Sequence, residues 1–362
     1  MVLGKIGTLT VEEARGLARD RLIAVAKGAD PSADRHAVRG AMTVGELSDL
    51  YLRNADGRIK PSTLAMDRSR IETHVKPLIG RLSVRSLTAA DIERMKSQII
   101  AGKTAKPRAN TGRGGKAAGG SGVAARTVGM LATILQYAIN PLRLIKENPA
   151  RYVRKPADGK QRRFLTLDEI GRLGAVMRGA EAAEENPVAL AAIRLLLLTG
   201  FRRMEALALP KAWIDPQSHC IRFGDTKSGA QLRVIGAPAV RLLEALPARA
   251  VSPWVFPGET RQGHFVGLPK VLARLCAKAG LEGVTLHVLR HSFASTAAGM
   301  GYSELTIAGL LGHSVPGVTA RYAHVPDAAL VSAADRIAAT ITAALDGVAE
   351  VGNIVPMRQG VA

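Results

Sequence analysis

The stretch L-G-H-S-V-P-G-V-T-A-R-Y-A-H-V (residues 311–325) is the most informative part of this chain, because it places His313 nine residues before Tyr322. Three other motifs precede it in a fixed order, and each contributes a basic or imidazole side chain. They are T-G-F-R-R-M-E-A-L (199–207), D-T-K-S-G (225–229) and H-V-L-R-H-S-F-A-S (287–295). The polar groups that the four motifs contribute together are Arg202, Lys227, His287, Arg290, His313 and Tyr322.

These residue types suit a reaction in which a side chain attacks a DNA phosphodiester. Negative charge builds on the non-bridging oxygens during such an attack, and a site that excludes water must neutralise it with fixed donors. Guanidinium groups stay charged and bind phosphate oxygens in a bidentate manner, so Arg202 and Arg290 would form a clamp. His287 and His313 would add donors. Because arginines carry the charge, no metal is required.

The attacking hydroxyl must later leave, and this favours a tyrosine. A phenol has a pKa of about 10 and leaves far more readily than an aliphatic alcohol, so Tyr322 is the expected nucleophile. The departing DNA 5′-oxygen needs a proton, which a lysine beside the phosphate, here Lys227, can donate.

The four motifs together resemble the tyrosine recombinase (phage integrase) family, over roughly residues 40–326. The resemblance implies two phosphate-binding arginines, a lysine in a β-turn, two active-site histidines, a tyrosine nucleophile and an acidic residue that supports the first arginine. In this order, the matching residues are Arg202 and Arg290, Lys227, His287 and His313, Tyr322, and Glu205. Because the set is complete in the sequence, we expect an active enzyme.

The resemblance implies a site-specific DNA recombinase, and specifically an integrase that inserts or excises a mobile element. Such an enzyme cleaves and rejoins DNA strands through a 3′-phosphotyrosine intermediate, without ATP, a metal or another cofactor. The implied partners are double-stranded DNA with att-like sites and further copies of the chain in a homo-tetramer on that DNA. An excisionase or a host DNA-bending protein is a further candidate partner.

Three alternatives stay open. An Xer-type recombinase that resolves chromosome or plasmid dimers uses the same chemistry, although an extra N-terminal helix and a long glycine-rich loop favour an integrase of a phage or genomic island. A type IB topoisomerase is disfavoured by the helical segment 42–150 and by the C-terminal tail. A non-catalytic DNA-binding repressor is disfavoured by the complete set of site residues.

Composition agrees with a nucleic-acid partner. The formal net charge is +20, which favours a polyanion, while 47% hydrophobic residues indicate a globular chain.

The two cysteines, Cys220 and Cys276, are too few for a disulfide framework or a zinc module. His287 and His291 have helical metal-pair spacing, but no third ligand with matching spacing follows, so no metal is expected. No apolar run approaches about 20 residues and no signal sequence is found, which predicts no membrane association and a cytoplasmic, nucleoid-associated protein.

The expected fold class is a mainly α multidomain protein. A helical SAM-like core-binding domain precedes a mixed α/β catalytic domain, which is mostly helical with a small antiparallel sheet. Residues 1–39 contain one helix, capped by Thr10 and Glu13 and running to about Lys27. It resembles the end of an arm-type DNA-binding domain whose strands are missing. Either this domain is degenerate or the start codon lies downstream of the true one.

Residues 40–150 form the core-binding domain, with four predicted helices. The first helix is capped by Thr43 and Glu46 and ends near Arg53. The second follows Pro61-Ser62-Thr63, the third spans 87–100 and the fourth spans about 124–139. Residues 103–123 are rich in Gly, Lys and Arg and predict a flexible loop. A basic linker, 151–163, follows. The basic residues expected to contact DNA phosphates in these segments are Lys103, Lys106, Arg108, Arg113, Lys116, Arg126, Arg151, Arg154, Lys155, Arg162 and Arg163.

The catalytic domain is expected at 164–326. A Thr166/Glu169 capping box opens it, and a helix carries Arg202. The segments 220–223 and 232–236 predict two strands joined by the turn that bears Lys227. Further helices are expected at about 264–280, 288–299 and 303–311.

A last helix is expected within the C-terminal segment 327–362, and it ends near Gly347. Its apolar residues fall on one face, so the helix should dock on another surface. These residues are Leu330, Ala334, Ile337, Ile341 and Ala344. Docking on its own catalytic domain is one possibility, while the family resemblance favours docking on a neighbouring protomer.

Overall fold

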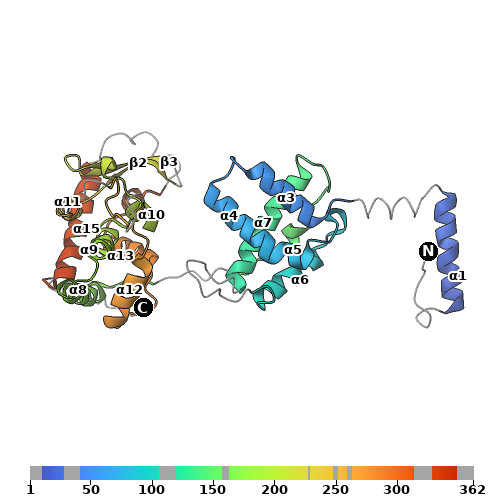
Figure 1. Cartoon of the computed structure of the whole chain (residues 1–362), viewed down its shortest axis with the longest axis horizontal. Helices are drawn as coiled ribbons and strands as arrows, with labels where there is room; N and C mark the ends of the chain where they lie inside the picture. Colours follow the sequence, from blue (N-terminus) through green and yellow to red (C-terminus); the bar gives the residue numbers. More distant parts are fainter. Residues whose placement is uncertain are drawn as a thin grey trace, which may run out of the picture. The chain divides into compact units, whose positions relative to one another are not determined.

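The computed structural model describes residues 10–27, 41–105, 119–156, 163–226, 229–247, 252–258, 263–313 and 328–348. The chain divides into two compact units, Met1–Lys160 and Gln161–Ala362, and Figure 1 shows their helices and strands. Tyr322 and Lys227 lie outside the described residues, as do most of the loop predicted at 103–123 and the end of the linker.

Helices make up the described part of the first unit. Its α-helices are α1 (Val11–Ala26), α3 (Val44–Ala55), α4 (Pro61–Arg70), α5 (Lys76–Ile79), α6 (Ala89–Ile100) and α7 (Ser121–Ile139). A π-helical turn, η1 (Ile71–Val75), joins α4 to α5, and two short 3-10 helices, η2 (Val84–Ser86) and η3 (Pro149–Tyr152), complete the unit. In Figure 1, α7 lies between α3 and α6, and it contacts both helices. The core around α7 includes Val128, Leu131 and Leu135, which are fully buried.

Local capping explains where three predicted helices begin. The Glu46 backbone N–H donates to Thr43 Oγ1 (3.2 Å), and the Thr43 N–H donates to the Glu46 carboxylate (2.8 Å). The same reciprocal pair joins Thr10 to Glu13 ahead of α1 and Thr166 to Glu169 ahead of the first helix of the second unit. Each pair satisfies backbone donors that the first helical turn leaves free, so these predicted starts are confirmed.

The second unit combines helices with a small sheet. Its α-helices are α8 (Leu167–Ala182), α9 (Pro187–Thr199), α10 (Arg203–Leu207), α11 (Ala237–Glu244), α12 (Leu268–Lys278), α13 (Leu286–Gly299), α14 (Glu304–Leu311) and α15 (Ala328–Asp346). The strands are β1 (Ile214–Asp215), β2 (Cys220–Thr226) and β3 (Gly229–Val234), preceded by the 3-10 helix η4 (Lys211–Trp213). The expected fold class, mainly helical with a small antiparallel sheet, is confirmed for the described residues.

Helix α9 forms the centre of the second unit. Every residue from Ala189 to Thr199 except Arg194 is buried, and α8, α11, α12, α13 and α15 all contact the helix. It ends at Gly200, whose φ of +62° suits glycine. A side chain there would meet the rings and methyl groups of Phe293 and Leu311. The turn that follows therefore starts from a rigid, buried point.

The sheet has the order β1-β2-β3 and is antiparallel throughout. Residue Ile221 pairs with Arg233 and with Ile214, and the hairpin closes with Thr226 opposite Gly229. Both predicted strands are present, and each is longer than expected at the hairpin end. The two-residue strand β1 was not predicted, because its length is too short for a detectable alternation.

Helix α15 packs on its own unit, which corrects the expectation of docking on a neighbouring protomer. Its residues Ile337 and Ile341 are fully buried in the core that α8, α9 and α11 share. Gly174 of α8 touches the Leu345 carbonyl and leaves no room for a side chain. The Asp335 carboxylate accepts from the Ala237 N–H (2.5 Å) and so caps the start of α11. The apolar stripe was predicted correctly, but its partner surface is in the same chain.

Two helices, α7 and α15, are long and apolar enough by composition to cross a membrane. Neither helix is an uninterrupted apolar run, since α7 contains Arg126 and α15 contains Arg336, so the prediction that no such run approaches about 20 residues is unchanged. In the structure, both helices place residues in the hydrophobic cores of their own units. Burial in a globular core accounts for their composition.

Candidate active site

Arg202 is fixed by Glu205, three residues further along the chain. It precedes α10 in an extended conformation and caps the helix, whereas the sequence predicted that it lies within a helix. Its backbone N–H donates to Glu205 Oε2 (2.9 Å) and its Nη1 donates to Oε1 (2.6 Å). Both oxygens of the carboxylate are thus engaged, so the guanidinium has a defined orientation.

Glu205 stays ionised in this arrangement. Burial raises the pKa of its carboxyl group, but hydrogen bonds from the Arg202 backbone and side chain, together with the charges of Arg233 and Arg202, outweigh burial. The pKa therefore lies below its ordinary value. An ionised Glu205 can hold Arg202 at neutral pH.

Arg290 lies on α13 and is almost fully buried. Its Nη1 donates to the Gly200 carbonyl (2.7 Å) and its Nη2 donates to the Leu311 carbonyl (3.0 Å). These acceptors stand at the C-terminal ends of α9 and α14, where backbone carbonyls lack helical partners and helix dipoles favour a cation. Burial, and then the charge of Arg202, lower the Arg290 pKa to about 10, so it is charged at neutral pH.

His313 and His287 lie beside these arginines. Burial lowers the pKa of both rings, and the charges of Arg290 and Arg202 lower it further. The His287 ring also packs edge-on against His291, with centroids 4.5 Å apart. His291 thus contacts a residue of the site. The lowered pKa values favour neutral imidazoles at pH 7, and both side chains are exposed.

The structure brings Arg202, Glu205, His287, Arg290 and His313 together from three separate segments. Two guanidiniums with neutral imidazoles around them can bind an anion whose charge is spread over several oxygens. Among the described residues, no group of three or more His, Cys, Asp or Glu side chains could hold a metal, and the His287–His291 pair has no third ligand there. Chemically, the site is suited to a phosphodiester.

Lys227 and Tyr322 both lie outside the described residues. The strands β2 and β3 are paired as far as Thr226 and Gly229, which flank Lys227 in the sequence. The chain is described up to His313 and again from Ala328, which are the residues on either side of the segment with Tyr322. Their roles stay predictions.

The residues predicted to bind DNA fall into three groups. Lys103, Arg126, Arg151, Arg154 and Lys155 lie in the described part of the first unit, where all five are exposed. None of these five forms an ion pair with a described acidic side chain. The group outside the described residues comprises Lys106, Arg108, Arg113, Lys116 and Arg162.

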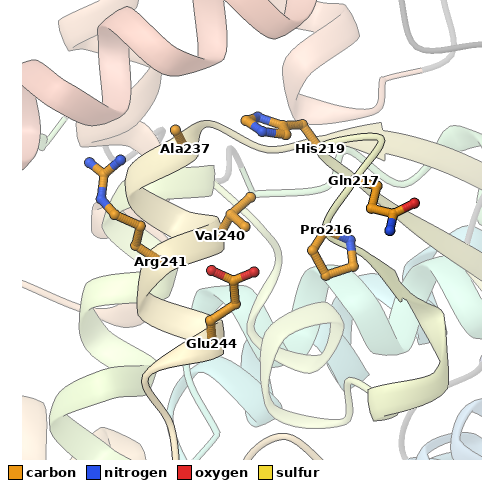
Figure 2. Close-up of a pocket in the computed structure, with 7 residues that line it drawn as sticks. All are labelled: Pro216, Gln217, His219, Ala237, Val240, Arg241 and Glu244. Carbon is orange, nitrogen blue, oxygen red and sulfur yellow. The ribbon is translucent and has the colours of Figure 1, made fainter.

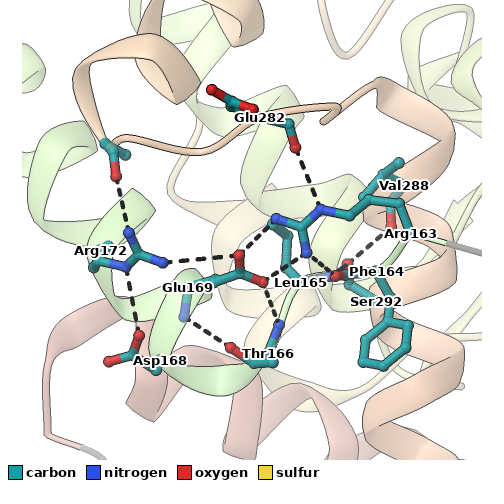
Figure 3. A network of polar contacts seen from close by, with 11 residues as sticks. Arg163, Phe164, Leu165, Thr166, Asp168, Glu169, Arg172, Glu282, Val288 and Ser292 are labelled. Carbon is teal, nitrogen blue, oxygen red and sulfur yellow. Dashed lines mark hydrogen bonds and ion pairs between the residues drawn. The ribbon is translucent and has the colours of Figure 1, made fainter.

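Arg163 has a different setting from that expected of a phosphate-binding linker residue. Figure 3 shows its guanidinium on the Glu169 carboxylate, with Nη2–Oε1 2.6 Å and Nη1–Oε2 2.8 Å apart. It also donates to the carbonyls of Glu282 and Phe164. The neighbouring Leu165 N–H donates to Ser292 Oγ on α13 (2.8 Å), the helix that carries Arg290. Arg163 thus anchors the start of the second unit.

The sequence did not single out Arg233, which lies on β3 behind Glu205 with its Nη1 3.8 Å from Glu205 Oε2. The available signal was an arginine inside a predicted strand, L-R-V-I-G, which is otherwise apolar. A hollow on the surface lies elsewhere, between the β1–β2 turn and α11 (Figure 2), and is lined by Pro216, His219 and Val240 among others. It contains none of the site residues.

Comparisons with known proteins agree with this geometry. The phage integrase family model matches residues 163–329, and the model for the N-terminal SAM-like domain of phage integrases matches residues 43–98. The tyrosine recombinase XerD of Rhizobium meliloti (strain 1021) is 32% identical over 178 residues, which cover 44% of this chain and 56% of that protein. The XerD of Brucella suis biovar 1 is 32% identical over 181 residues, 45% of this chain and 59% of that protein. The chain therefore spans less than two thirds of the length of these relatives.

Solved structures extend the likeness over both units. A lambda integrase tetramer bound to a Holliday junction has a TM-score of 0.63 at 18% identity, covering 85% of this chain and 89% of that chain. The Tn1549 transposon integrase in complex with circular intermediate DNA has a TM-score of 0.59 at 17% identity, covering 81% and 99%. At this identity, the likeness concerns the fold.

Proposed function

Because the chain belongs to the phage integrase family, we propose that it is a site-specific DNA recombinase that cleaves and rejoins strands through a 3′-phosphotyrosine. The observation that carries the proposal is the convergence of two oriented arginines: Glu205 holds Arg202, and the Gly200 and Leu311 carbonyls hold Arg290. Their placement leaves His287 and His313 exposed beside them. This cluster can stabilise the charge that develops on a phosphate under attack.

In the proposed first step, the Tyr322 phenol oxygen bonds to phosphorus and the bond from phosphorus to the 5′-oxygen breaks. The neutral ring of His287 can accept the phenolic proton, since its lowered pKa leaves it unprotonated at pH 7. Lys227 would donate a proton to the departing 5′-oxygen. Arg202 and Arg290 would bind the non-bridging oxygens throughout.

In the proposed second step, a 5′-hydroxyl of the partner strand attacks the phosphotyrosine. A new phosphodiester forms as the bond from phosphorus to the Tyr322 oxygen breaks; Lys227 would take the proton of the attacking hydroxyl, and His287 would return a proton to the phenol. The bond energy is retained in the protein-linked ester, so the reaction needs neither ATP nor a metal. Recombination between two duplexes requires this exchange on each strand, which is the reason to propose a homo-tetramer on DNA; the lambda integrase tetramer supports this assembly by its similar fold.

We further propose an integrase of a phage or genomic island, acting at att-like sites in the cytoplasm and on the nucleoid. The solved integrases of similar fold support this proposal. The XerD relatives, 32% identical in part of the chain, favour the alternative of a dimer-resolving recombinase. Recombination assays on two reporter plasmids distinguish an integrase from a dimer-resolving recombinase. An integrase joins two different sites flanking its element, whereas a resolving enzyme acts on two copies of one site.

A nicked suicide DNA substrate tests the proposed chemistry. Loss of the short strand after cleavage traps the covalent complex, which resists SDS. Covalent trapping with strand joining between two duplexes is the expected result. No trapping on any duplex from the source DNA would favour a repressor, and trapping with relaxation of supercoils but no joining would favour a type IB topoisomerase.

A further inference from the structure

Arg233 is a buried arginine at the back of the candidate active site. Its side chain is only 1% exposed, and its guanidinium lies 5.2 Å from the ring centroid of Phe201. The Nε–H donates to the Leu310 carbonyl (3.1 Å), near the end of α14. Gly312, two residues further on, touches the guanidinium so closely that no other side chain would fit there. The next residue along the chain is His313.

The two terminal nitrogens of Arg233 are unusual because neither has a hydrogen-bond partner among the described residues. The nearest opposite charge is Glu205 Oε2, 3.8 Å from Nη1. A buried charge with unsatisfied donors is costly for folding, so a structural purpose alone does not explain it. Burial lowers the pKa of Arg233 to about 9, which still leaves it charged at neutral pH.

We propose that Arg233 is a positioning residue for the phosphate site. It acts through Glu205 on Arg202, and through the Leu310 carbonyl on the segment that carries His313 and continues to Tyr322. The inference rests on the proposed function, because the phosphate it prepares for is the one that the recombinase would cleave. Arg233 is too deeply buried to touch that phosphate itself.

The charges of the cluster support this role. Arg202, Arg233 and Arg290 are cationic, and Glu205 is the only carboxylate that the described structure places among them. With neutral histidines, the cluster keeps an excess of positive charge, which an incoming phosphate can offset. Arg233 would keep Glu205 ionised without competing with Arg202 for its two hydrogen bonds, since 3.8 Å exceeds hydrogen-bond length.

As a positioning residue, Arg233 should affect stability and activity differently when it is replaced in Arg233→Met. Methionine fills similar space and removes a poorly satisfied buried charge, a change that is often neutral or stabilising. The melting temperature should therefore stay equal or rise, while single-turnover cleavage at saturating DNA falls by about tenfold or more. Arg233→Lys keeps the charge without the planar fork and should recover part of the rate. Arg222→Met, on the exposed side of β2, is the control and should change neither quantity.

The pH dependence of cleavage gives a second readout that a purely structural role would not change. The charged or titratable groups facing Glu205 are Arg202, Arg233, Arg290 and His313. Without the positive charge of Arg233, the pKa of both Glu205 and His313 should rise, so the acid limb of the pH–rate profile should move to higher pH. Arg233→Lys retains the positive charge, so the acid limb of its pH–rate profile should stay at the wild-type position.

Suicide-substrate cleavage by the wild-type protein is measured first, because its failure would overturn the proposed function itself. If the wild type cleaves, a folded Arg233→Met variant with a rate within about twofold of the wild type, or with an unshifted acid limb, would overturn only the role of Arg233. If Arg233→Met does not fold, Arg233→Lys decides: a reduced rate at wild-type DNA affinity supports positioning, and a wild-type rate rejects it.

Discussion

Arg290 Nη2 lies 2.9 Å from His313 Nε2, and this contact determines which nitrogen of the ring carries the proton. An arginine has only donors, so Nε2 must accept and the neutral ring must be protonated on Nδ1. The contact holds His313 beside the arginine that is tied to the ends of α9 and α14. Its strength therefore depends on His313 remaining neutral.

The first prediction concerns this pH dependence. Burial, then Arg290, Arg202 and Arg233, lower the pKa of His313 below its ordinary value of 6.5, so the contact is intact at pH 7. As the pH falls through the lowered pKa, protonation removes the acceptor and places two cations together, and cleavage should decline. His313→Gln keeps an acceptor that does not titrate, so its pH–rate profile should decline less. Protonation of His287 at low pH can also reduce cleavage. The test is therefore the difference between the pH–rate profiles of the variant and the wild type. An identical decline in both proteins would show that His313 is not responsible.

The second prediction assigns the proton donor. If Lys227 protonates the departing 5′-oxygen, it should matter little when sulfur, a better leaving group, replaces that oxygen. Lys227→Ala should therefore cleave a 5′-bridging phosphorothioate well and an ordinary phosphodiester poorly. Equal defects on both substrates would assign the lysine to DNA binding.

The third prediction concerns α15. Ile337 is fully buried in the core of its own unit, whereas Ala339 on the same helix is exposed. Ile337→Asp should lower the free energy of unfolding of the protein without DNA by about 3–5 kcal/mol, because it removes core packing and buries a charge. Ala339→Asp introduces the same carboxylate at the surface and should cost less than about 1 kcal/mol. Urea unfolding measures both. A stable Ile337→Asp monomer that failed only in assembly would show that α15 docks on the neighbouring protomer.

The fourth prediction separates anchoring from DNA contact. Arg126 on α7 is exposed, while the Arg163 guanidinium is bound to Glu169 (2.6 and 2.8 Å). Arg126→Ala should weaken DNA binding and reduce the slope of log K against log salt by about one, as expected for a lost phosphate contact. Arg163→Ala should keep that slope and lower the melting temperature instead. The reverse pattern would place Arg163 on the DNA.

Several features could be predicted from sequence because they depend on neighbours in the chain. The capping pairs at Thr43 and Thr166 are local patterns, and the apolar stripe of α15 follows from helical spacing. The meeting of Arg202 with Arg290 followed from the motifs through the family resemblance. What could not be predicted depends on tertiary contacts. The stripe on α15 does not reveal that Gly174 leaves space for it.

Burial of charge was likewise not predictable. Arg163 and Arg233 are both arginines in basic or strand-like segments, and only the fold reveals that Glu169 binds the first and that Phe201 and Leu310 enclose the second. The position of Arg202 at the start of α10, and not within a helix, was also not predictable from the sequence. Its extended backbone is stabilised by the Glu205 carboxylate that its own N–H contacts.

Tyr322 is the proposed nucleophile, and the mass of the trapped complex identifies the residue that attacks the phosphate. After reaction with a suicide substrate and digestion of protein and DNA, the peptide that contains Tyr322 should carry a nucleotide on its phenol oxygen. Tyr322→Phe should bind the same duplex with nearly unchanged affinity, because the arginine clamp remains, and should form no SDS-resistant complex. A nucleotide on another residue, or a covalent complex with Tyr322→Phe, would exclude Tyr322 as the nucleophile.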